Sequence, residues 1–149
     1  MIPVLERLND ANVRYLVIGG QAMRLEGLPR FTMDWDLFIP PRDEDNFQKL
    51  NEALKEWLDG PVLPLGKHGE NFVQTYQTPW GVLQFHLAPP GLRTFAEVAA
   101  CARVVVERGV SIQCVGSEDL LRSKEAVGRP QDQQDIELLK RKYAKPETL

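Results

Sequence analysis

Short apolar runs and longer amphipathic stretches alternate along the first half of the chain. Apolar residues three or four positions apart predict a helix with one buried face, whereas a compact apolar run that stops at glycine or proline predicts a buried strand. The pattern therefore predicts helices over residues 3–12, 21–26 and 42–58, and strands over residues 15–18 and 37–39. Strands that alternate with helices are typical of an α/β arrangement.

The second half of the chain contains two pairs of β-rich runs. Residues 72–78 and 82–87 predict a hairpin with a tight turn at residues 79–81, and residues 104–107 and 110–115 predict further strands. Helices are expected over residues 95–102 and 117–127, the latter with Ser117 as its N-cap, and a last helix should carry Ile136, Leu139 and Tyr143 on one stripe. We therefore expect a single α/β (α+β) domain over residues 1–149, with a mixed β-sheet flanked by helices.

The strongest candidate for chemistry lies where the first predicted strand ends. Gly19 and Gly20 stand there between the strand and a helix, and glycine lets a phosphate approach main-chain N–H groups without a side chain in the way. Asp34 and Asp36 precede the next apolar run and, being two positions apart on a strand, should project to the same face. Two carboxylates so close repel each other, which favours a divalent cation such as Mg²⁺ or Mn²⁺ between them.

Each of these features also has a plainer interpretation. Two glycines fit an ordinary tight strand-to-helix turn, and two aspartates fit a solvated strand edge. The glycine turn followed by the aspartate pair, with Arg30 and Thr32 just ahead of it, favours the nucleotide and metal interpretation.

These motifs resemble those of the nucleotidyltransferase superfamily, in which an apolar strand and a Gly-Gly or Gly-Ser turn are followed by an Asp-x-Asp pair. Within it, the chain is most similar to small bacterial abortive-infection and toxin-type (AbiEii-like) nucleotidyltransferases. The similarity extends to the C-terminal part of the chain, through Ser117, Glu118, Asp119, Leu120, Lys124, Ala126, Gly128, Arg129, Asp132 and Asp135.

The resemblance implies the nucleotidyltransferase fold, with the site at the ends of the first two strands and the hairpin. It also implies transfer of a nucleoside monophosphate from a nucleoside triphosphate, assisted by Mg²⁺ or Mn²⁺. Asp34 and Asp36 would hold the metal, and the nucleotide-binding residues would be Gly19, Gly20, Gln21, Arg30 and Lys124.

Catalytic members of the family carry a third carboxylate on a later strand, and the matching position here is His86. Alternation places Val82, Gln84 and His86 on one face of their strand, so His86 should face the aspartates. With one negative charge fewer, Mg²⁺ should bind more weakly. A neutral imidazole could still act as a catalytic base or ligate Mn²⁺ or Zn²⁺, whereas a protonated one would pair with the aspartates and describe a retired site.

Charged residues near the C-terminus have two interpretations. Lys124 could reach a triphosphate or lie on the exposed face of an amphipathic helix. Arg129, Asp132 and Asp135 more readily form ion pairs between the last two helices, with Asp135 orienting Lys124.

A segment near the middle of the chain weakly resembles a phosphate-binding Walker loop. Its glycines, Gly60 and Gly66, are one residue too far apart, and His68 stands where Ser or Thr would bind magnesium. We instead expect residues 64–71 to form a mobile loop near the site.

Composition narrows the class of protein further. The net charge of −3 and the pI of about 5.4 provide no general basic field for nucleic-acid binding. The two cysteines indicate neither a disulfide framework nor a zinc cluster, and no apolar stretch is long enough to span a bilayer. We expect a cytoplasmic protein with no membrane partner.

The sequence thus predicts a nucleotidyltransferase acting from a nucleoside triphosphate on an acceptor that could be a small molecule, an RNA end or a protein. The alternative is a catalytically silent nucleotide-binding module, for instance one partner of a toxin–antitoxin pair, in which His86 marks a degenerate site.

Overall fold

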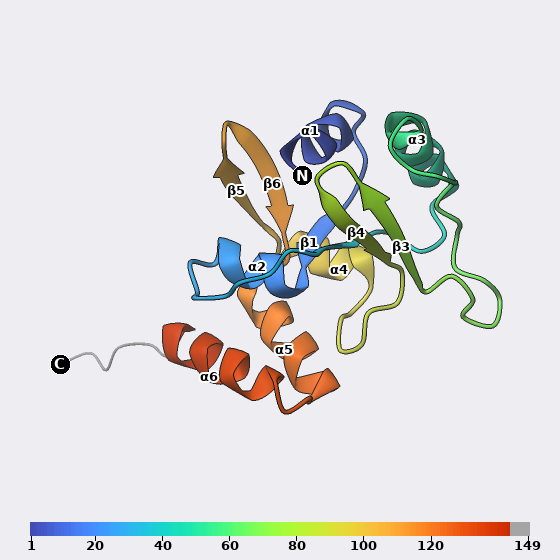
Figure 1. Ribbon diagram of the computed structural model, residues 1–149. Coiled ribbons are helices and arrows are strands. Elements are labelled where there is room, and N and C mark those ends of the chain that lie inside the picture. The colour runs from blue at the N-terminus through green and yellow to red at the C-terminus, as the bar shows by residue number, and fades with distance from the viewer. Residues whose placement is uncertain (144–149) are drawn as a thin grey trace.

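A six-stranded mixed sheet organises residues 1–143, the part of the chain that the computed structural model describes (Figure 1). In chain order the elements are α1 (Ile2–Asp10), β1 (Leu16–Ile18), α2 (Gly19–Leu25), β2 (Trp35–Phe38), α3 (Glu44–Leu54), β3 (Val73–Thr78), β4 (Gly81–His86), α4 (Phe95–Ala100), β5 (Arg103–Glu107), β6 (Val110–Cys114), α5 (Ser117–Val127) and α6 (Asp132–Tyr143).

The strands lie in the order β3-β4-β2-β1-β6-β5. β1 runs antiparallel to β2 and parallel to β6, and β2 runs parallel to β4. All three residues of β1 are buried, as expected for a central strand covered on both faces. The expected mixed sheet and the predicted β3–β4 hairpin are confirmed. The further strands expected over residues 104–107 and 110–115 are also present, and they form a second hairpin, β5–β6.

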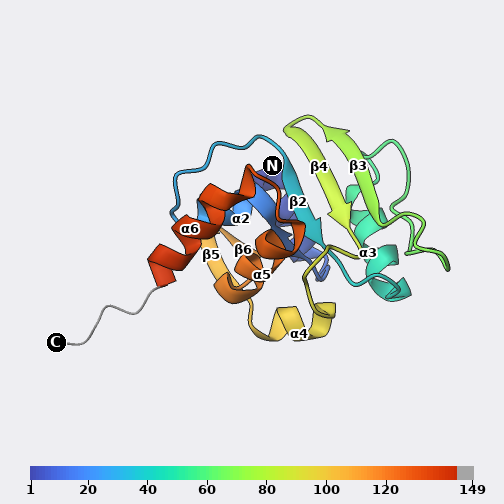
Figure 2. The ribbon, with the colours of Figure 1, turned by 90° about the horizontal axis from the view of Figure 1, so that it is seen from below.

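The helices gather in two places around this sheet. α1 contacts α3 and β6, and α2 contacts β1 and β2. α5 and α6 pack together beside the end of the sheet at which β1 stops (Figure 1). The view from below shows α4 next to α5 (Figure 2). The end of β1 therefore faces this pair of helices.

Several element boundaries differ from those expected. α3 begins at Glu44 because the Asp43 side chain caps it, accepting a 3.1 Å hydrogen bond from the Asn46 amide, and it ends at Leu54 instead of residue 58. Ser117 was wrong as the N-cap of α5, since Gly116 occupies that position without a side-chain cap. A Cβ at Gly116 would lie 2.4 Å from the Cys101 carbonyl oxygen, so close packing excludes a capping side chain there.

Among the described residues, no helix is both long and apolar enough to cross a membrane.

Candidate active site

The glycine turn and an aspartate meet directly at the end of β1. Ile18 is paired with Asp36 across the antiparallel β1–β2 ladder, which brings the carboxylate to the turn. Gly19 has a φ of +68°, and a Cβ there would lie 2.8 Å from Asp36 Oδ2. Glycine is therefore required twice at this position, for its left-handed backbone and for the space that the carboxylate occupies.

His86 reaches the same carboxylate from β4. In the parallel β2–β4 register His86 lies beside Phe38, on the face that also carries Asp36. Its Nε2 is 2.7 Å from Asp36 Oδ1, and each of the two side chains is about one-fifth exposed (19% and 20%). The expectation that His86 faces the aspartates thus holds for Asp36.

Asp34 lies apart from this contact. It stands one residue before β2 begins and is exposed, and its carbonyl oxygen accepts a 3.4 Å hydrogen bond from Thr32 Oγ1. Trp35, between the two acids, is 7% exposed and fixes the strand's orientation. Asp36 is therefore held inside the site, whereas Asp34 precedes the first residue of β2 and is exposed to solvent.

The donor set for a metal is correspondingly small. Within residues 1–143 no three His, Cys, Asp or Glu side chains are grouped so as to hold a metal ion. Magnesium commonly takes only one or two carboxylates and completes its shell with water and substrate phosphates. Asp36, with the exposed Asp34 two positions before it, offers at most the one or two carboxylates that such a site uses, and the described residues form no metal cage of their own.

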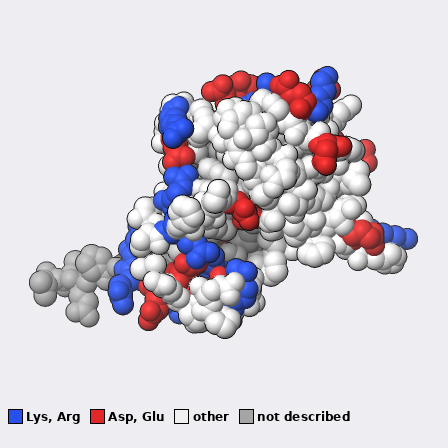
Figure 3. Space-filling model, viewed as in Figure 1, with Lys and Arg blue, Asp and Glu red and all other residues white. Residues whose placement is uncertain are grey.

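Asp36 and His86 open into a cavity of about 320 Å³ between the sheet and helices α5 and α6. In the space-filling view acidic atoms appear in this hollowed part of the surface, and basic and acidic atoms alternate over the two helices below it (Figure 3). Its lining is Ile18, Gly19, Asp36, Gln84, His86, Pro89, Pro90, Ser123, Lys124, Val127, Arg129 and Asp132.

Lys124 on α5 forms the helical wall of the cavity. Its side chain is only 8% exposed, and its Nζ lies 3.1 Å from Asp135 Oδ2 and 3.5 Å from Asp132 Oδ1. Two carboxylate partners offset the cost of burying this side chain at the cavity surface. The interpretation of Lys124 as an exposed helix-face residue is wrong.

Asp132 and Asp135 also bind two arginines. Arg129 Nε donates to Asp132 Oδ2 at 2.8 Å, and this hydrogen bond is the main reason why the pKa of Asp132 lies below its usual value. Arg30 Nη1 lies 3.2 Å from Asp135 Oδ2. The predicted ion-pair set between the last two helices is confirmed, and Asp135 does orient Lys124.

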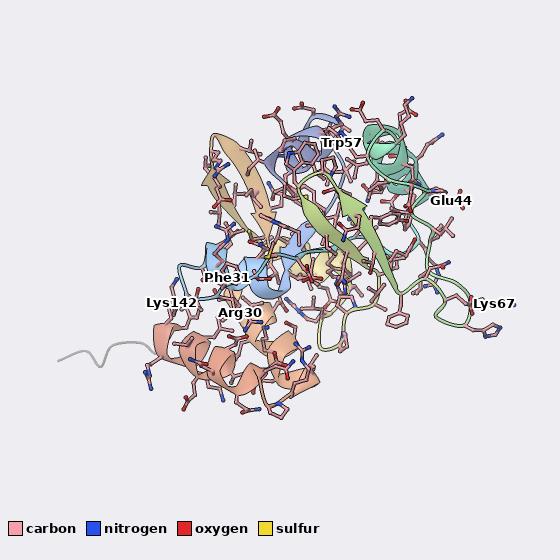
Figure 4. All side chains as sticks on the ribbon, viewed as in Figure 1. Arg30, Phe31, Glu44, Trp57, Lys67 and Lys142 are labelled. Carbon is pink, nitrogen blue, oxygen red and sulfur yellow. The ribbon has the colours of Figure 1, made fainter. Side chains whose placement is uncertain are left out.

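Three predicted nucleotide-binding residues lie outside the cavity lining. Arg30 is held by Asp135. Figure 4 shows Arg30 on the side of its loop that faces α6. Gln21 is buried. Its Nε2 donates to the Thr32 carbonyl oxygen at 3.2 Å, and its Oε1 accepts from Arg24 Nε at 2.7 Å. Gly20 packs against Thr32, whose Cβ would lie 3.0 Å from an added Cβ. These residues support the turn, and Gly19 and Lys124 alone of that group line the cavity.

Sequence reasoning missed the loop after β4. Pro89 and Pro90 line the cavity because Gly91 (φ +77°) packs onto α5, where a Cβ would lie 2.5 Å from that of Ala126 and 2.7 Å from the Arg122 carbonyl oxygen. No sequence motif predicts the contact between Gly91 and α5. Gln84, by contrast, could have been found from its alternation with His86 on one strand face.

Two other regions stay outside the site. The loop of residues 64–71 was expected near it, but none of its residues lines the cavity, and Lys67 lies at the right-hand edge of the molecule, well away from Arg30 (Figure 4). A larger open hollow of about 730 Å³ lies between α1, α4 and the β5–β6 hairpin. Its polar groups are bonded to one another, Tyr15 Oη to Asn9 Oδ1 at 2.8 Å and Asn9 Nδ2 to the Ser111 carbonyl at 2.6 Å.

No protein-family model and no curated protein matches the sequence. Solved structures do match the fold. A protein of Thermotoga maritima, TM1012, assigned as a nucleotidyltransferase, is 13% identical, with a TM-score of 0.66 over 93% of this chain and 89% of that one.

The lincosamide antibiotic adenylyltransferase LnuA, with lincomycin bound, is 18% identical and has a TM-score of 0.62 over 92% of each chain. ANT(2")-Ia, in complex with adenylyl-2"-tobramycin, is 17% identical, with a TM-score of 0.60 over 94% of this chain and 85% of that one. The chain has the nucleotidyltransferase fold. At these identities the likeness identifies the architecture, while the activity must be argued from the residues of the cavity.

Proposed function

We propose that this protein is a metal-dependent nucleotidyltransferase that moves a nucleoside monophosphate from a nucleoside triphosphate to a hydroxyl acceptor. The supporting observation is the position of Asp36, against the Gly19 turn and across the cavity from the charged wall at Lys124. An acid, a glycine turn and a lysine around one cavity match the needs of a triphosphate, which requires cations and closely approaching backbone.

In this proposal Asp34 and Asp36 hold Mg²⁺ or Mn²⁺ once the nucleotide is present. The bound ion would neutralise the charge that develops on the transferring phosphoryl group. Asp36 would be the anchoring ligand because β1, β2 and His86 hold it in place. The exposed Asp34 would join when the nucleotide arrives.

The chain's other residues would bind and orient the nucleotide. Lys124 would contact phosphate oxygens while Asp132 and Asp135 keep its amine in place. Gly19 would leave room for the phosphates beside Asp36, and Arg30 and Gln21 would support the turn from outside the cavity.

His86 would act on the acceptor. An imidazole 2.7 Å from Asp36 has the geometry of a base oriented by a carboxylate, and it could accept the proton of an acceptor hydroxyl.

The same contact also favours a second candidate, a silent nucleotide-binding module or toxin–antitoxin partner of the AbiEii-like type. In that case His86 would occupy one oxygen of Asp36 permanently, and the metal would lack a ligand.

Calorimetric titration with nucleoside triphosphates, in the presence and absence of Mg²⁺ or Mn²⁺, tests the proposal when it is combined with an assay for pyrophosphate release. We expect metal-dependent binding that Asp36→Asn abolishes and Asp34→Asn weakens. Asp45→Asn, on the exposed surface of α3, is the matched control and should bind as the parent does. Binding without pyrophosphate release on any acceptor tested would favour the silent module, and no binding at all would contradict both candidates.

His86 distinguishes the candidates further. If it is the acceptor base, His86→Gln should abolish turnover and leave nucleotide affinity nearly unchanged. His86→Asp restores the family's third carboxylate and should raise activity with Mg²⁺. An inert His86→Asp variant that still binds nucleotide would count against a catalytic role for this position.

The acceptor can be sought with a labelled nucleotide. Two of the neighbouring structures carry lincomycin or adenylylated tobramycin, so small hydroxyl-bearing molecules are the first class to test. Incubating the protein and α-labelled triphosphate with small-molecule, RNA and protein fractions of a cell extract should label one fraction, and Asp36→Asn should label none.

A further inference from the structure

Strand β5 forms one edge of the sheet, and in the described part of the chain it pairs only with β6. Its alternate residues Val104 and Val106 are 56% and 66% exposed. Proteins usually protect an edge strand with charge, proline or a bulge on its exposed positions, because an open edge offers unpaired N–H and C=O groups to other strands. An edge that displays two valines is suited to pairing.

The hairpin geometry determines which backbone groups are available. Arg108 (φ +50°) and Gly109 (φ +78°) form a two-residue turn of the kind that matches strand twist. Glu107 and Val110 flank this turn and face each other, so they bond to one another, and bonded pairs then alternate along the ladder. Val104 and Val106 therefore direct their main-chain groups away from β6, toward the open edge.

The opposite face of β5 carries charge at both ends. Arg103 Nε lies 2.6 Å from Glu26 Oε1, and Glu107 accepts hydrogen bonds of 2.7 and 3.0 Å from Arg24. Along β5 a positive residue is therefore followed by three valines and then by a negative residue. This order is complementary to itself when the strand is reversed.

We propose that β5 pairs antiparallel with β5 of a second copy, about a two-fold axis at Val105. Val104 then faces Val106 of the partner subunit, in two symmetric bonded pairs, and the four valines form one apolar patch on the exposed face. Arg103 faces Glu107 of the partner subunit on the other face, which extends each ion pair across the interface. Cross-strand apolar and opposite-charge pairs both stabilise such a ladder.

The register follows from the same facts. A shift by one residue would place groups that already bond β6 against groups directed outward, so the new ladder could not form. A shift by two residues preserves the hydrogen bonds but moves Arg103 away from the partner's Glu107 and breaks up the valine patch. Only the register centred on Val105 satisfies backbone, apolar and charged groups together.

The interface is separate from the proposed nucleotidyl transfer. β5 lies two strands beyond β1, and none of its residues lines the cavity between the sheet and α5 and α6 (Figure 1). A continuous sheet through two copies leaves both cavities open.

Sedimentation velocity over a range of protein concentrations tests the proposal on the full chain. We expect a reversible dimer, and Val106→Lys should raise its dissociation constant roughly tenfold or more, because it removes both Val104–Val106 cross-strand pairs and brings two like charges into the valine patch. The matched control is Val73→Lys, which changes a 36% exposed valine on β3, the opposite edge strand. It should leave the dimer unchanged.

Hydrogen exchange on the unmodified chain gives a second measurement that does not depend on a variant folding. The amides of Val104 and Val106 should become protected as the concentration rises through the dissociation constant. A chain that stays monomeric, a dimer that Val106→Lys and Val73→Lys affect equally, or β5 amides whose exchange does not change on dimerisation would each overturn the proposal.

Discussion

The two walls of the cavity are stabilised differently. On the helical wall every charge has partners within the chain: Lys124 has two buried carboxylates, and Arg129 has Asp132. On the sheet wall Asp36 has one ion-pair partner, His86. The exposed Asp34, which lies outside the cavity lining, has no side-chain ion pair among the described residues. Electrostatics on the helical wall therefore serve the fold, whereas on the sheet wall negative charge is left for a ligand to neutralise.

This comparison predicts that a change on the sheet wall affects function with little effect on stability. Asp36→Asn removes a charge that is one-fifth exposed and has a single partner, so the free energy of unfolding should change little. Nucleotidyl transfer should fall roughly 100-fold or more, because the carboxylate proposed to anchor the metal ion is lost. Pyrophosphate release and thermal unfolding, measured on the same preparation, check the activity and the stability. A variant that is clearly destabilised but retains its activity would reverse the comparison.

A change on the helical wall should instead lower the stability of the fold. The Asp132 side chain is 0% exposed. Asp132→Asn leaves Lys124 with one carboxylate partner and removes the partner of Arg129. We expect a loss of about 3 kcal/mol in the free energy of unfolding, measured in urea. Glu137→Gln, on the exposed face of α6, is the control and should stay within about 0.5 kcal/mol of the parent.

The junction between the walls should respond to a single methyl group. Gly19→Ala forces a side chain into a left-handed backbone position and against Asp36 Oδ2, so we expect a loss of about 1–2 kcal/mol together with weaker nucleotide binding. Gly60→Ala meets no atom within 4 Å and should be nearly neutral in both assays. Equal effects at the two glycines would show that the turn has no special geometry.

Acid should weaken the helical wall. The pKa of Asp132 is lowered in the folded chain, mainly by the hydrogen bond from Arg129, so its contribution to stability is fully present above the unfolded-state pKa and is lost as the pH falls through the folded value. The difference in unfolding free energy between the parent and Asp132→Asn should therefore shrink below about pH 4. A difference that stays constant down to strongly acidic pH would mean that Asp132 is not paired as described.

Much of this arrangement could be predicted from sequence because local patterns determine it. The strand–glycine–helix order at Gly19, the β3–β4 hairpin and the approach of His86 to Asp36 follow from alternation and turn chemistry. The C-terminal ion pairs followed from the spacing of their charges.

What sequence could not predict are contacts between segments that no motif relates. Arg30 and Gln21 were expected on the nucleotide, but Asp135 and Thr32 hold them. The Pro89–Pro90 lining depends on how closely Gly91 approaches α5, and the loop of residues 64–71 lies far away because Leu65 bonds back to the Pro41 carbonyl at 2.9 Å. Each outcome depends on tertiary packing, for which one sequence gives no distance information.

The strand that carries His86 shows how such a site can change its chemistry. Its neighbours Phe85 and Leu87 are 0% and 2% exposed and belong to the core, while His86 opens into the cavity. Folding thus constrains the residues on either side more tightly than it constrains position 86. A single codon change there could exchange an imidazole for a carboxylate, or silence the protein, and each variant would still reach the same folded state.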